Sequence, residues 1–196
     1  MTRRRRVLAY LYMETASTDK LAKKVVMNQE KLLRASDVYK DLGHKVVLTI
    51  GSWDLLHIGH VRYLNKAKSM GDILIVGVDS DRAIKAYKGP LRPIVPEHER
   101  CEMVSYQACV DLVTVIDDVD DSGAWQLGLV RQIKPDVFVA VEDSYPQDQI
   151  DELKKYSSEV IVLPRQAEET STSRMIQGTL KKHLIDMLSK VEEKSL

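Results

Sequence analysis

The residues best suited to chemistry lie in one segment, residues 51–60, which reads GSWDLLHIGH. Asp54, His57 and His60 are spaced by three, so at the start of a helix their side chains can face one direction. Gly59 has no side chain and would let a bulky group approach the backbone between the two imidazoles. Free N–H groups at a helix N-terminus and two imidazole donors together suit a phosphate. The segment therefore predicts a phosphate-binding site.

Two further stretches carry candidate residues of the same kind. Lys85, Lys88 and Arg92 occur where glycine and proline punctuate the chain, a setting for mobile cations that close over phosphates, although an ordinary surface loop fits equally well. Arg100, in the helix that follows, suits either a structural role or a phosphate ligand. Near the C-terminus, Arg165 precedes a hydroxyl-rich turn, which is typical of helix capping but could also present a second helix N-terminus to a polyphosphate. The residues of that turn are Ser171, Thr172 and Ser173.

Other familiar site types are missing from the sequence. No G-x-G-x-x-G follows a strand and no G-x-x-x-x-G-K-[ST] occurs, which argues against a dinucleotide dehydrogenase and a P-loop NTPase. Cys101 and Cys109 form neither a disulfide framework nor a zinc cluster, which favours a reducing, cytoplasmic compartment. Lysine plus arginine and aspartate plus glutamate each number 29, so no global basic field favours nucleic acid or a membrane. The basic start at Arg3 to Arg6 is interpreted as a solvated tail or an edge element rather than a targeting signal.

The elements that must position these residues alternate along the chain. Short apolar runs predict strands at 45–50, 73–78, 112–116, 136–141 and 159–163. Helices are expected at 28–42, from 58 to the Gly71-Asp72 stop, and at 97–108, 123–133, 147–156 and 172–189. Repeated strand–helix–strand units predict an α/β fold, a Rossmann-like doubly wound five-stranded parallel sheet with helices on both faces. The expected organisation is an N-terminal extension, 1–27, and one domain, 28–196, whose ligands bind beyond the carboxyl ends of the strands.

Taken together, these motifs resemble the H-x-G-H nucleotidyltransferase superfamily, in its cytidylyltransferase-like branch. The likeness runs from about Lys45 to Leu180 and includes GDILIVGVDSD, KGPLRP, PEHER and KPDVFV besides the histidine segment. The KG-x-x-RP block is most similar to the adenylyltransferase domain of ADP-heptose synthases, and next to glycerol-3-phosphate cytidylyltransferases. The resemblance implies transfer of AMP, or CMP, from ATP or CTP to a phosphorylated sugar or polyol, with release of pyrophosphate.

The resemblance also implies a role for each matching residue. His57 and His60 would stabilise the α- and β-phosphates, and Lys85 and Lys88 would be mobile catalytic cations. Expected nucleotide- or phosphate-binding residues are Gly51, Ser52, Trp53, Asp54, Gly59, Arg165, Ser171, Thr172 and Ser173. Expected acceptor-binding residues are Asp81, Arg92, Arg100 and Asp143. No protein metal site is expected, because Mg²⁺ would arrive on the nucleotide, and a homodimer is expected both from the family and from the apolar surface of the helix at 97–108.

The acceptor region departs from both of these relatives. Heptose adenylyltransferases carry a KGGDY-like turn after the fourth strand, whereas this chain has Ala140-Val141-Glu142-Asp143-Ser144, in which only Asp143 remains. Glycerol-phosphate enzymes carry a basic residue where this chain has Ala108. The reaction type therefore follows from the resemblance, whereas the base, the acceptor and the pathway do not.

Three alternatives compete with this interpretation. An aminoacyl-tRNA synthetase fragment would share HIGH but needs a KMSKS-like loop and far more length. Phosphopantetheine and nicotinamide-mononucleotide adenylyltransferases fit the KG-x-x-RP block poorly. A catalytically silent nucleotide-binding protein stays open, because the turn at 140–144 is degenerate.

Overall fold

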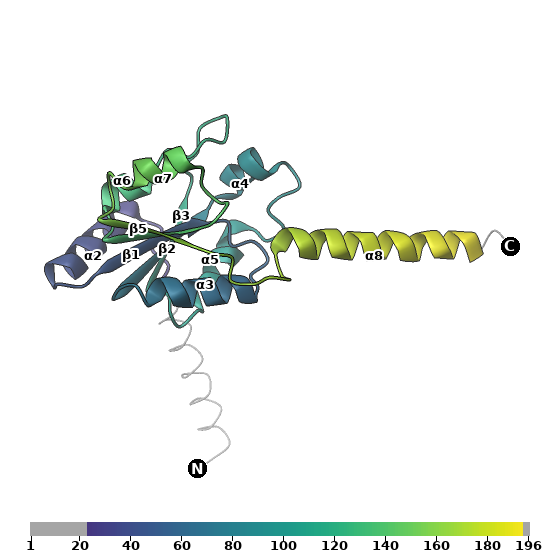
Figure 1. The fold of residues 1–196 in the computed structure, drawn as a ribbon, viewed down its shortest axis with the longest axis horizontal. Helices are drawn as coiled ribbons and strands as arrows, with labels where there is room; N and C mark the ends of the chain where they lie inside the picture. Colours follow the sequence, from purple (N-terminus) through teal and green to yellow (C-terminus); the bar gives the residue numbers. More distant parts are fainter. Residues whose placement is uncertain (1–22, 194–196) are drawn as a thin grey trace, which may run out of the picture.

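A five-stranded parallel sheet forms the centre of the molecule (Figure 1). The computed structural model describes residues 23–193. The strands are β1 (Val46–Gly51), β2 (Ile73–Asp79), β3 (Leu112–Ile116), β4 (Val137–Val141) and β5 (Glu159–Leu163), in the order β3-β2-β1-β4-β5. The predicted doubly wound, Rossmann-like α/β fold is confirmed.

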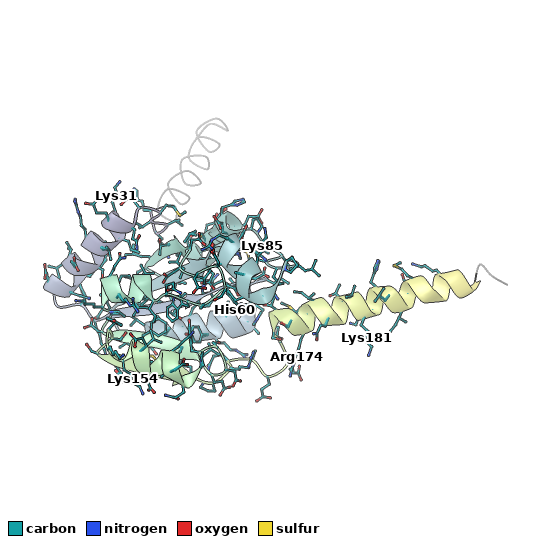
Figure 2. The ribbon with its side chains drawn as sticks, turned by 90° about the horizontal axis from the view of Figure 1, so that it is seen from above. Lys31, His60, Lys85, Lys154, Arg174 and Lys181 are labelled. Atoms are coloured by element: carbon teal, nitrogen blue, oxygen red, sulfur yellow. The ribbon has the colours of Figure 1, made fainter. Side chains whose placement is uncertain are left out.

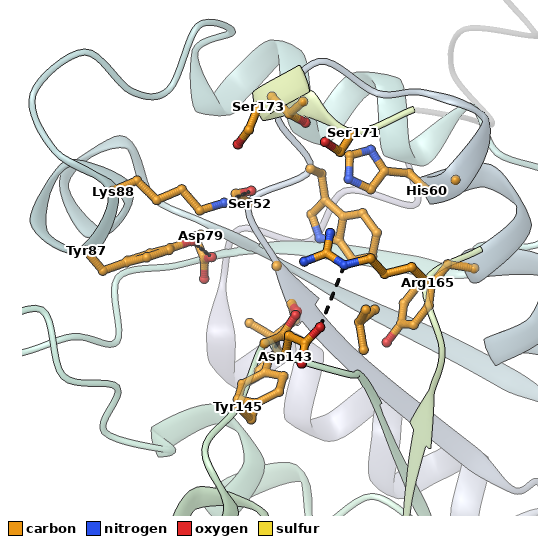
Figure 3. A pocket seen from close by; sticks show the side chains of 18 of the residues that line it. Ser52, His60, Asp79, Tyr87, Lys88, Asp143, Tyr145, Arg165, Ser171 and Ser173 are labelled. Atoms are coloured by element: carbon orange, nitrogen blue, oxygen red, sulfur yellow. Dashed lines mark hydrogen bonds and ion pairs between the residues drawn. The ribbon is translucent and has the colours of Figure 1, made fainter. Parts of the chain in front are cut away.

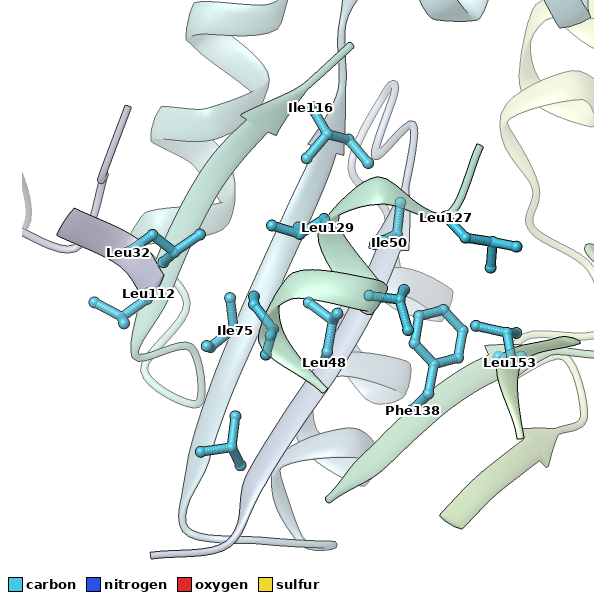
Figure 4. Packing of buried hydrophobic residues seen from close by; sticks show 14 of the residues in the cluster. Leu32, Leu48, Ile50, Ile75, Leu112, Ile116, Leu127, Leu129, Phe138 and Leu153 are labelled. Atoms are coloured by element: carbon cyan, nitrogen blue, oxygen red, sulfur yellow. The ribbon is translucent and has the colours of Figure 1, made fainter. Parts of the chain in front are cut away.

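Helices cover both faces of this sheet. They are α2 (Gln29–Asp41), α3 (Ile58–Lys68), α4 (Asp81–Lys88), α5 (Glu97–Ser105), α6 (Gly128–Ile133), α7 (Gln147–Leu153) and α8 (Thr172–Glu193). Apolar residues of α2, α6 and α7 pack on one face, where Leu129 of α6 lies over Leu48 and Ile75 of the sheet (Figure 4). Residues of α3 and α5 pack on the other face. Near-continuous apolar strands are what a sheet buried on both faces requires.

Two segments differ from the sequence prediction. The stretch expected as a loop at 81–88 is α4, because Ser80 caps it: the Ala83 N–H donates to the Ser80 hydroxyl at 2.9 Å. The helix expected at 123–133 begins only at Gly128, because Asp120 accepts hydrogen bonds from the N–H groups of Ser122 and Ala124 and holds the preceding residues in a turn.

The chain ends flank this core. Residues 24–26 run beside β3, where the Val26 N–H donates to the Val113 carbonyl at 2.8 Å, so the folded unit begins before residue 28. The rest of the predicted extension, including the basic stretch, lies outside the described residues. At the other end, α8 projects away from the sheet (Figure 1). None of the described helices has the length and apolar character to span a membrane.

The strand order fixes where a ligand can bind. The chain moves from β1 outward through β2 to β3, and then returns to the other side of β1 for β4 and β5. Loops after β1 and β4 therefore diverge and leave a crevice at the carboxyl ends of these strands. The histidine segment follows β1 and enters this crevice.

Candidate active site

One cleft lies at the carboxyl ends of the strands, with a volume of about 980 Å³ (Figure 3). Segments that follow β1, β2, β3, β4 and β5 all contribute to its lining. A volume at the upper end of the range for small-molecule sites leaves room for two ligands. We call the lining around His57, His60, Ser171 and Thr172 the phosphate side, and the lining around Asp79, Tyr87 and Trp125 the β2–β3 side.

The tautomer of His57 follows from its place at the N-cap of α3. Its Nδ1 accepts a hydrogen bond from the Gly59 N–H at 3.1 Å, so Nδ1 carries no proton and Nε2–H is the donor. Desolvation lowers the pKa of His57, which keeps the ring neutral. Trp53 and Leu55, just before it, adopt left-handed backbone conformations with φ of 50° and 49°, which turn the chain sharply between β1 and α3. A neutral N–H donor at the cleft is the result.

His60 lies one helical turn further on and stacks on His57, with ring centroids 3.9 Å apart. The Trp53 ring contacts it edge-on at 5.5 Å. Burial, followed by the nearby His57 and Lys88, lowers the pKa of His60 to about 3. His60 is therefore neutral at physiological pH, and both imidazoles can donate a hydrogen bond without carrying a charge.

Gly59 lines the cleft, and at this position groups of the protein itself come close to the backbone. A Cβ on this residue would lie 2.9 Å from Cε1 of His57 and 3.1 Å from Cβ of Ala167. Ala167 belongs to the loop between β5 and α8. The absence of a side chain thus lets that loop close against the histidine segment.

Asp54 was expected to bind nucleotide or phosphate, and the structure corrects this. Its side chain is fully buried and accepts hydrogen bonds from Nε of Arg92 at 2.7 Å and from the N–H groups of Ile94 and Val95. Burial alone would raise its pKa, but the two N–H groups and Arg92 together lower it, so it stays ionised. Its carbonyl accepts from the Thr172 hydroxyl at 2.7 Å. Asp54 therefore ties together the histidine segment, the loop after α4 and the start of α8.

Lys88, at the end of α4, reaches across the cleft toward β1 (Figure 3). Its Nζ donates to the Ser52 hydroxyl at 2.8 Å, and desolvation and the nearby Arg92 lower its pKa. Arg92 also lines the cleft while it pairs with Asp54. The loop between Lys88 and Arg92 is thus anchored at both ends, and two of the predicted cations lie at the site.

The last helix brings the predicted hydroxyl turn to the phosphate side. The Ser171 hydroxyl accepts from the Arg174 N–H at 3.2 Å and so caps α8, while Ser173 lines the same cleft (Figure 3). Arg165, before this turn, lies 4.0 Å from the Asp143 carboxylate in the cleft lining. Gly51, Ser52 and Trp53 line the cleft as well, and Nε1 of Trp53 donates to the Gly77 carbonyl at 2.9 Å.

Three other predicted residues are placed outside the cleft. Arg100 has no exposed surface and donates to the carbonyls of Val95 and Ser52 and to Asp81, so it has no surface left for an acceptor. Asp81 starts α4 and pairs with Arg100 at 2.7 Å. Lys85 is exposed on α4 and is not among the residues that line the cleft. Arg100 and Asp81 have a structural role, because a buried guanidinium needs these partners.

The structure adds residues to the β2–β3 side that the sequence did not single out. Asp79, the last residue of β2, lines the cleft together with Tyr87 and Trp125. Tyr145, which follows β4, contacts the Trp125 ring at 5.2 Å. The only feature of the sequence that could have indicated Asp79 was its position at the carboxyl end of a predicted buried strand. Nothing in the sequence indicated Trp125, whose loop was expected to be helical.

Within residues 23–193, no group of three histidine, cysteine, aspartate or glutamate side chains is arranged to hold a metal ion. The donor set of the cleft is instead made of imidazole, ammonium, guanidinium and hydroxyl groups. Such a set suits polyphosphate oxygens.

Comparison with known proteins agrees with this chemistry. A family model described as cytidylyltransferase-like matches residues 48–183. The bifunctional protein HldE of Helicobacter hepaticus is 37% identical over 173 residues, which cover 88% of this chain and 34% of the relative. The bifunctional protein HldE of Helicobacter acinonychis is 42% identical over 118 residues, 60% of this chain and 24% of the relative. The chain thus spans about a third or less of the length of these relatives.

A solved structure supports the same relationship. The lipopolysaccharide core biosynthesis protein of Thermoplasma volcanium superposes with a TM-score of 0.54 at 25% sequence identity. The superposition covers 63% of this chain and 98% of that protein.

Proposed function

The chain belongs to the cytidylyltransferase-like family of nucleotidyltransferases, and from that premise we propose that it transfers AMP from ATP to a phosphorylated sugar and releases pyrophosphate. The observation that carries the proposal is the convergence of two phosphate-binding elements on one cleft. The stacked donors His57 and His60 lie at the start of α3, and the Ser171 cap lies at the start of α8. Their convergence fits a triphosphate that spans both.

The residues act by positioning and by neutralising charge. An oxygen of the acceptor phosphate attacks the α-phosphorus as the bond to the α,β-bridging oxygen breaks, and pyrophosphate leaves with that electron pair. His57 Nε2–H and His60 would donate hydrogen bonds to the oxygens on which charge builds. Lys88 would bring the two phosphates together despite their charges. The start of α8 would hold the β- and γ-phosphates through N–H groups and hydroxyls.

Mg²⁺ is proposed as the counterion of the triphosphate, bound by its oxygens and water rather than by a protein cage. When bound, Mg²⁺ would withdraw charge from the phosphates. Omitting Mg²⁺ should abolish turnover without unfolding the protein.

ATP is preferred over CTP in this proposal because the Lys88–Pro93 block is similar to the heptose adenylyltransferases. A sugar acceptor is supported by the HldE relatives and by the lipopolysaccharide biosynthesis protein. Glycerol 3-phosphate with CTP is the second candidate, on the strength of the Leu163-Pro164-Arg165 and Ser171–Ser173 segments.

A pyrophosphate-release matrix tests the function. ATP, CTP, GTP and UTP are each paired with heptose, hexose and polyol phosphates in the presence of Mg²⁺. We expect turnover with ATP or CTP and not with GTP or UTP, and a clear preference for GTP or UTP would contradict the proposal. Nucleotide binding by calorimetry without release for any acceptor would instead favour the silent nucleotide-binding protein.

We further propose a cytoplasmic homodimer, since ATP is a cytoplasmic substrate. On α5, Cys101 and Val104 are buried against the sheet, whereas Met103 on the same helix and Tyr106 directly after it are 37% and 48% exposed. These exposed apolar side chains support a contact between two copies. A light-scattering mass equal to that of the monomer at micromolar concentration would reject the dimer.

A further inference from the structure

The two histidines of the phosphate side are oriented in different ways. His57 is held by a hydrogen bond from the Gly59 N–H to its Nδ1. Nδ1 of His60 is buried and forms no hydrogen bond with any group among residues 23–193, so Nε2 is the nitrogen left for a ligand of the cleft. Because a donor to a phosphate must point its N–H in one direction, the imidazole of His60 needs a support of another kind.

Aromatic contacts supply this support. The imidazole of His60 stacks on His57, with ring centroids 3.9 Å apart, and it also contacts the indole of Trp53. The centroids of the indole and the imidazole are 5.5 Å apart and the ring planes meet at 67°, an edge-to-face arrangement that aromatic pairs prefer. Rotating the imidazole out of this orientation would break its contact with at least one of the two rings.

The indole of Trp53 is itself fixed from two directions. Its Nε1–H donates a hydrogen bond to the Gly77 carbonyl of β2 at 2.9 Å. Its ring contacts Tyr63 of α3 at 5.9 Å, and the Tyr63 hydroxyl donates to the Val139 carbonyl of β4 at 2.7 Å. Only 5% of Trp53 is exposed. The indole is therefore a rigid surface against which a neighbouring ring can be held.

The backbone at Trp53 indicates that this position needs its side chain. The φ of 50° lies in the left-handed region, which glycine and asparagine adopt more readily than residues with bulky side chains. Such a conformation persists only where the surrounding structure determines it, and it occurs preferentially at active sites and ligand clamps. The presence of a large aromatic residue here is explained by what the indole contacts, which are Gly77, His60 and Tyr63.

We propose that Trp53 is a positioning residue for His60, whose imidazole it holds with Nε2 directed at the phosphates. The hydrogen bond to Gly77 is the essential feature, because a phenyl ring in the same place has no N–H donor. Such a ring would leave the Gly77 carbonyl without this donor and would be free to shift, and the imidazole would shift with it. The inference rests on the proposed function for the groups to which His60 donates, and not for the positioning itself.

Two substitutions separate the ring from its anchor. Trp53→Phe keeps an aromatic ring and removes the N–H donor, whereas Trp53→Leu removes both. We expect kcat for pyrophosphate release to fall roughly tenfold in Trp53→Phe and further in Trp53→Leu, because a misplaced donor loses its contact with charge that builds only in the transition state. The KM for ATP should change less than about twofold, since binding of the ground state does not depend on that contact.

Nuclear magnetic resonance of the free protein tests the positioning without turnover. In the wild type, the imidazole nitrogen shifts should show one neutral tautomer of His60, with the proton on Nε2. It should not titrate between about pH 5 and pH 8, because burial lowers its pKa to about 3. In Trp53→Leu the imidazole loses its cover, so both tautomers should appear and the pKa should rise toward the usual 6.5. The other charged or titratable groups that act on His60, which are His57, Lys88 and Asp54, are the same in every variant.

Tyr39→Leu is a matched control. Tyr39 contacts His44 edge-on, with ring centroids 6.0 Å apart and planes at 71°, so this substitution also removes an aromatic neighbour of a histidine. Tyr39 belongs to α2 and does not line the cleft. Figure 2 shows α2, marked by Lys31, at the opposite end of the domain from the start of α8, marked by Arg174. The kinetics and the His60 signals of Tyr39→Leu should match the wild type, and a thermal melt of each variant sets a temperature at which it is folded.

The outcomes separate the positioning role from the proposed reaction. A lower kcat together with altered His60 signals supports the positioning role, and altered signals in a protein that releases no pyrophosphate support it while the proposed reaction fails. In an active enzyme, a change in neither readout or in only one of them overturns it. A raised KM for ATP with kcat unchanged also overturns it and would assign the indole to nucleotide binding.

The wild type decides if neither Trp53 variant folds. One His60 tautomer and slow exchange of the Trp53 indole N–H with solvent would support the proposal. Two tautomers, or rapid exchange of that N–H, would overturn it.

Discussion

The phosphate side and the β2–β3 side of the cleft are built in different ways. On the phosphate side, His57 and His60 belong to one short segment, and the orientation of His57 is set by a hydrogen bond to Gly59, two residues away. On the β2–β3 side, Asp79, Tyr87 and Trp125 come from a strand end, a helix and a loop. Only packing between distant elements brings them together.

This difference teaches which parts of the site tolerate change. A phosphate is recognised by N–H groups at helix starts, which any sequence with the right turn can supply. The side chains of the β2–β3 side are held by the whole fold, as Arg82 and Gly123 hold the loop of Trp125 against α4. We therefore expect the β2–β3 side to be more sensitive than the phosphate side to substitutions in distant elements.

The largest effect is expected on the phosphate side. His57→Ala and His60→Ala should each lower turnover by roughly 10² or more, about 3 kcal/mol, as when a donor to the transition state is lost. The loss should fall mainly on kcat, because charge builds on the bridging oxygen only during transfer. Steady-state kinetics of pyrophosphate release measures it.

His44→Ala and His183→Ala are the controls for these two variants, since His44 contacts Tyr39 before β1 and His183 is exposed on α8. An equal loss of kcat in His183→Ala would contradict the assignment. If His57→Ala destabilises the fold but each folded molecule keeps its activity, the histidine has a structural role.

A second prediction concerns Asp54, which joins the histidine segment to the loop after α4. Asp54→Asn should lower the free energy of unfolding by about 2 kcal/mol, since it leaves the largely buried Arg92 without its counter-charge. Urea denaturation measures this, with the exposed Asp148→Asn as the matched control. If Asp54→Asn is as stable as that control, the carboxylate is not the anchor of the loop after α4.

Lys88 and Lys85 provide a sharper test because they belong to the same helix. Lys88→Met should lower kcat by roughly tenfold, about 1.4 kcal/mol, since its ammonium lies in the cleft beside Ser52. Lys85→Met should have a clearly smaller effect, because Lys85 is exposed and does not line the cleft. Similar kcat values for the two variants would show that α4 rearranges when substrates bind.

The smallest effect concerns stability as a function of pH. The pKa of His60 is lowered to about 3, whereas the usual value for histidine is 6.5, so between these pH values the unfolded chain binds the extra proton. The free energy of unfolding must then decrease as the pH falls below about 6.5. Because one extra proton is bound, the decrease is at most about 1.4 kcal/mol per pH unit. Urea denaturation between neutral pH and about pH 5 should show a steeper loss for the wild type than for His60→Gln. Equal slopes would mean that His60 is not desolvated.

The sequence by itself determined the sheet and the phosphate side. The hydrophobic periodicities of strands and helices depend on residues that are neighbours in the chain. The histidine segment and the hydroxyl turn also contain their own helix caps, at His57 and Ser171. The resemblance to nucleotidyltransferases rested on the same local segments. The main errors in the elements were at 81–88 and 123–127, where the side chains of Ser80 and Asp120 accept backbone hydrogen bonds that decide between helix and turn. The helices predicted to reach 108 and 156 end earlier, at Ser105 and Leu153.

Only the tertiary structure decided which polar residues face the cleft. Asp79 and Asp81 are two residues apart, yet Asp79 ends β2 at the cleft while Asp81 starts α4 and turns to the buried Arg100. Asp54 was predicted to bind nucleotide or phosphate, but its carboxylate instead anchors the loop after α4. That loop buries it, and it is distant from Asp54 in the sequence. Burial and partner choice depend on residues far away in the chain, so no local pattern can encode them.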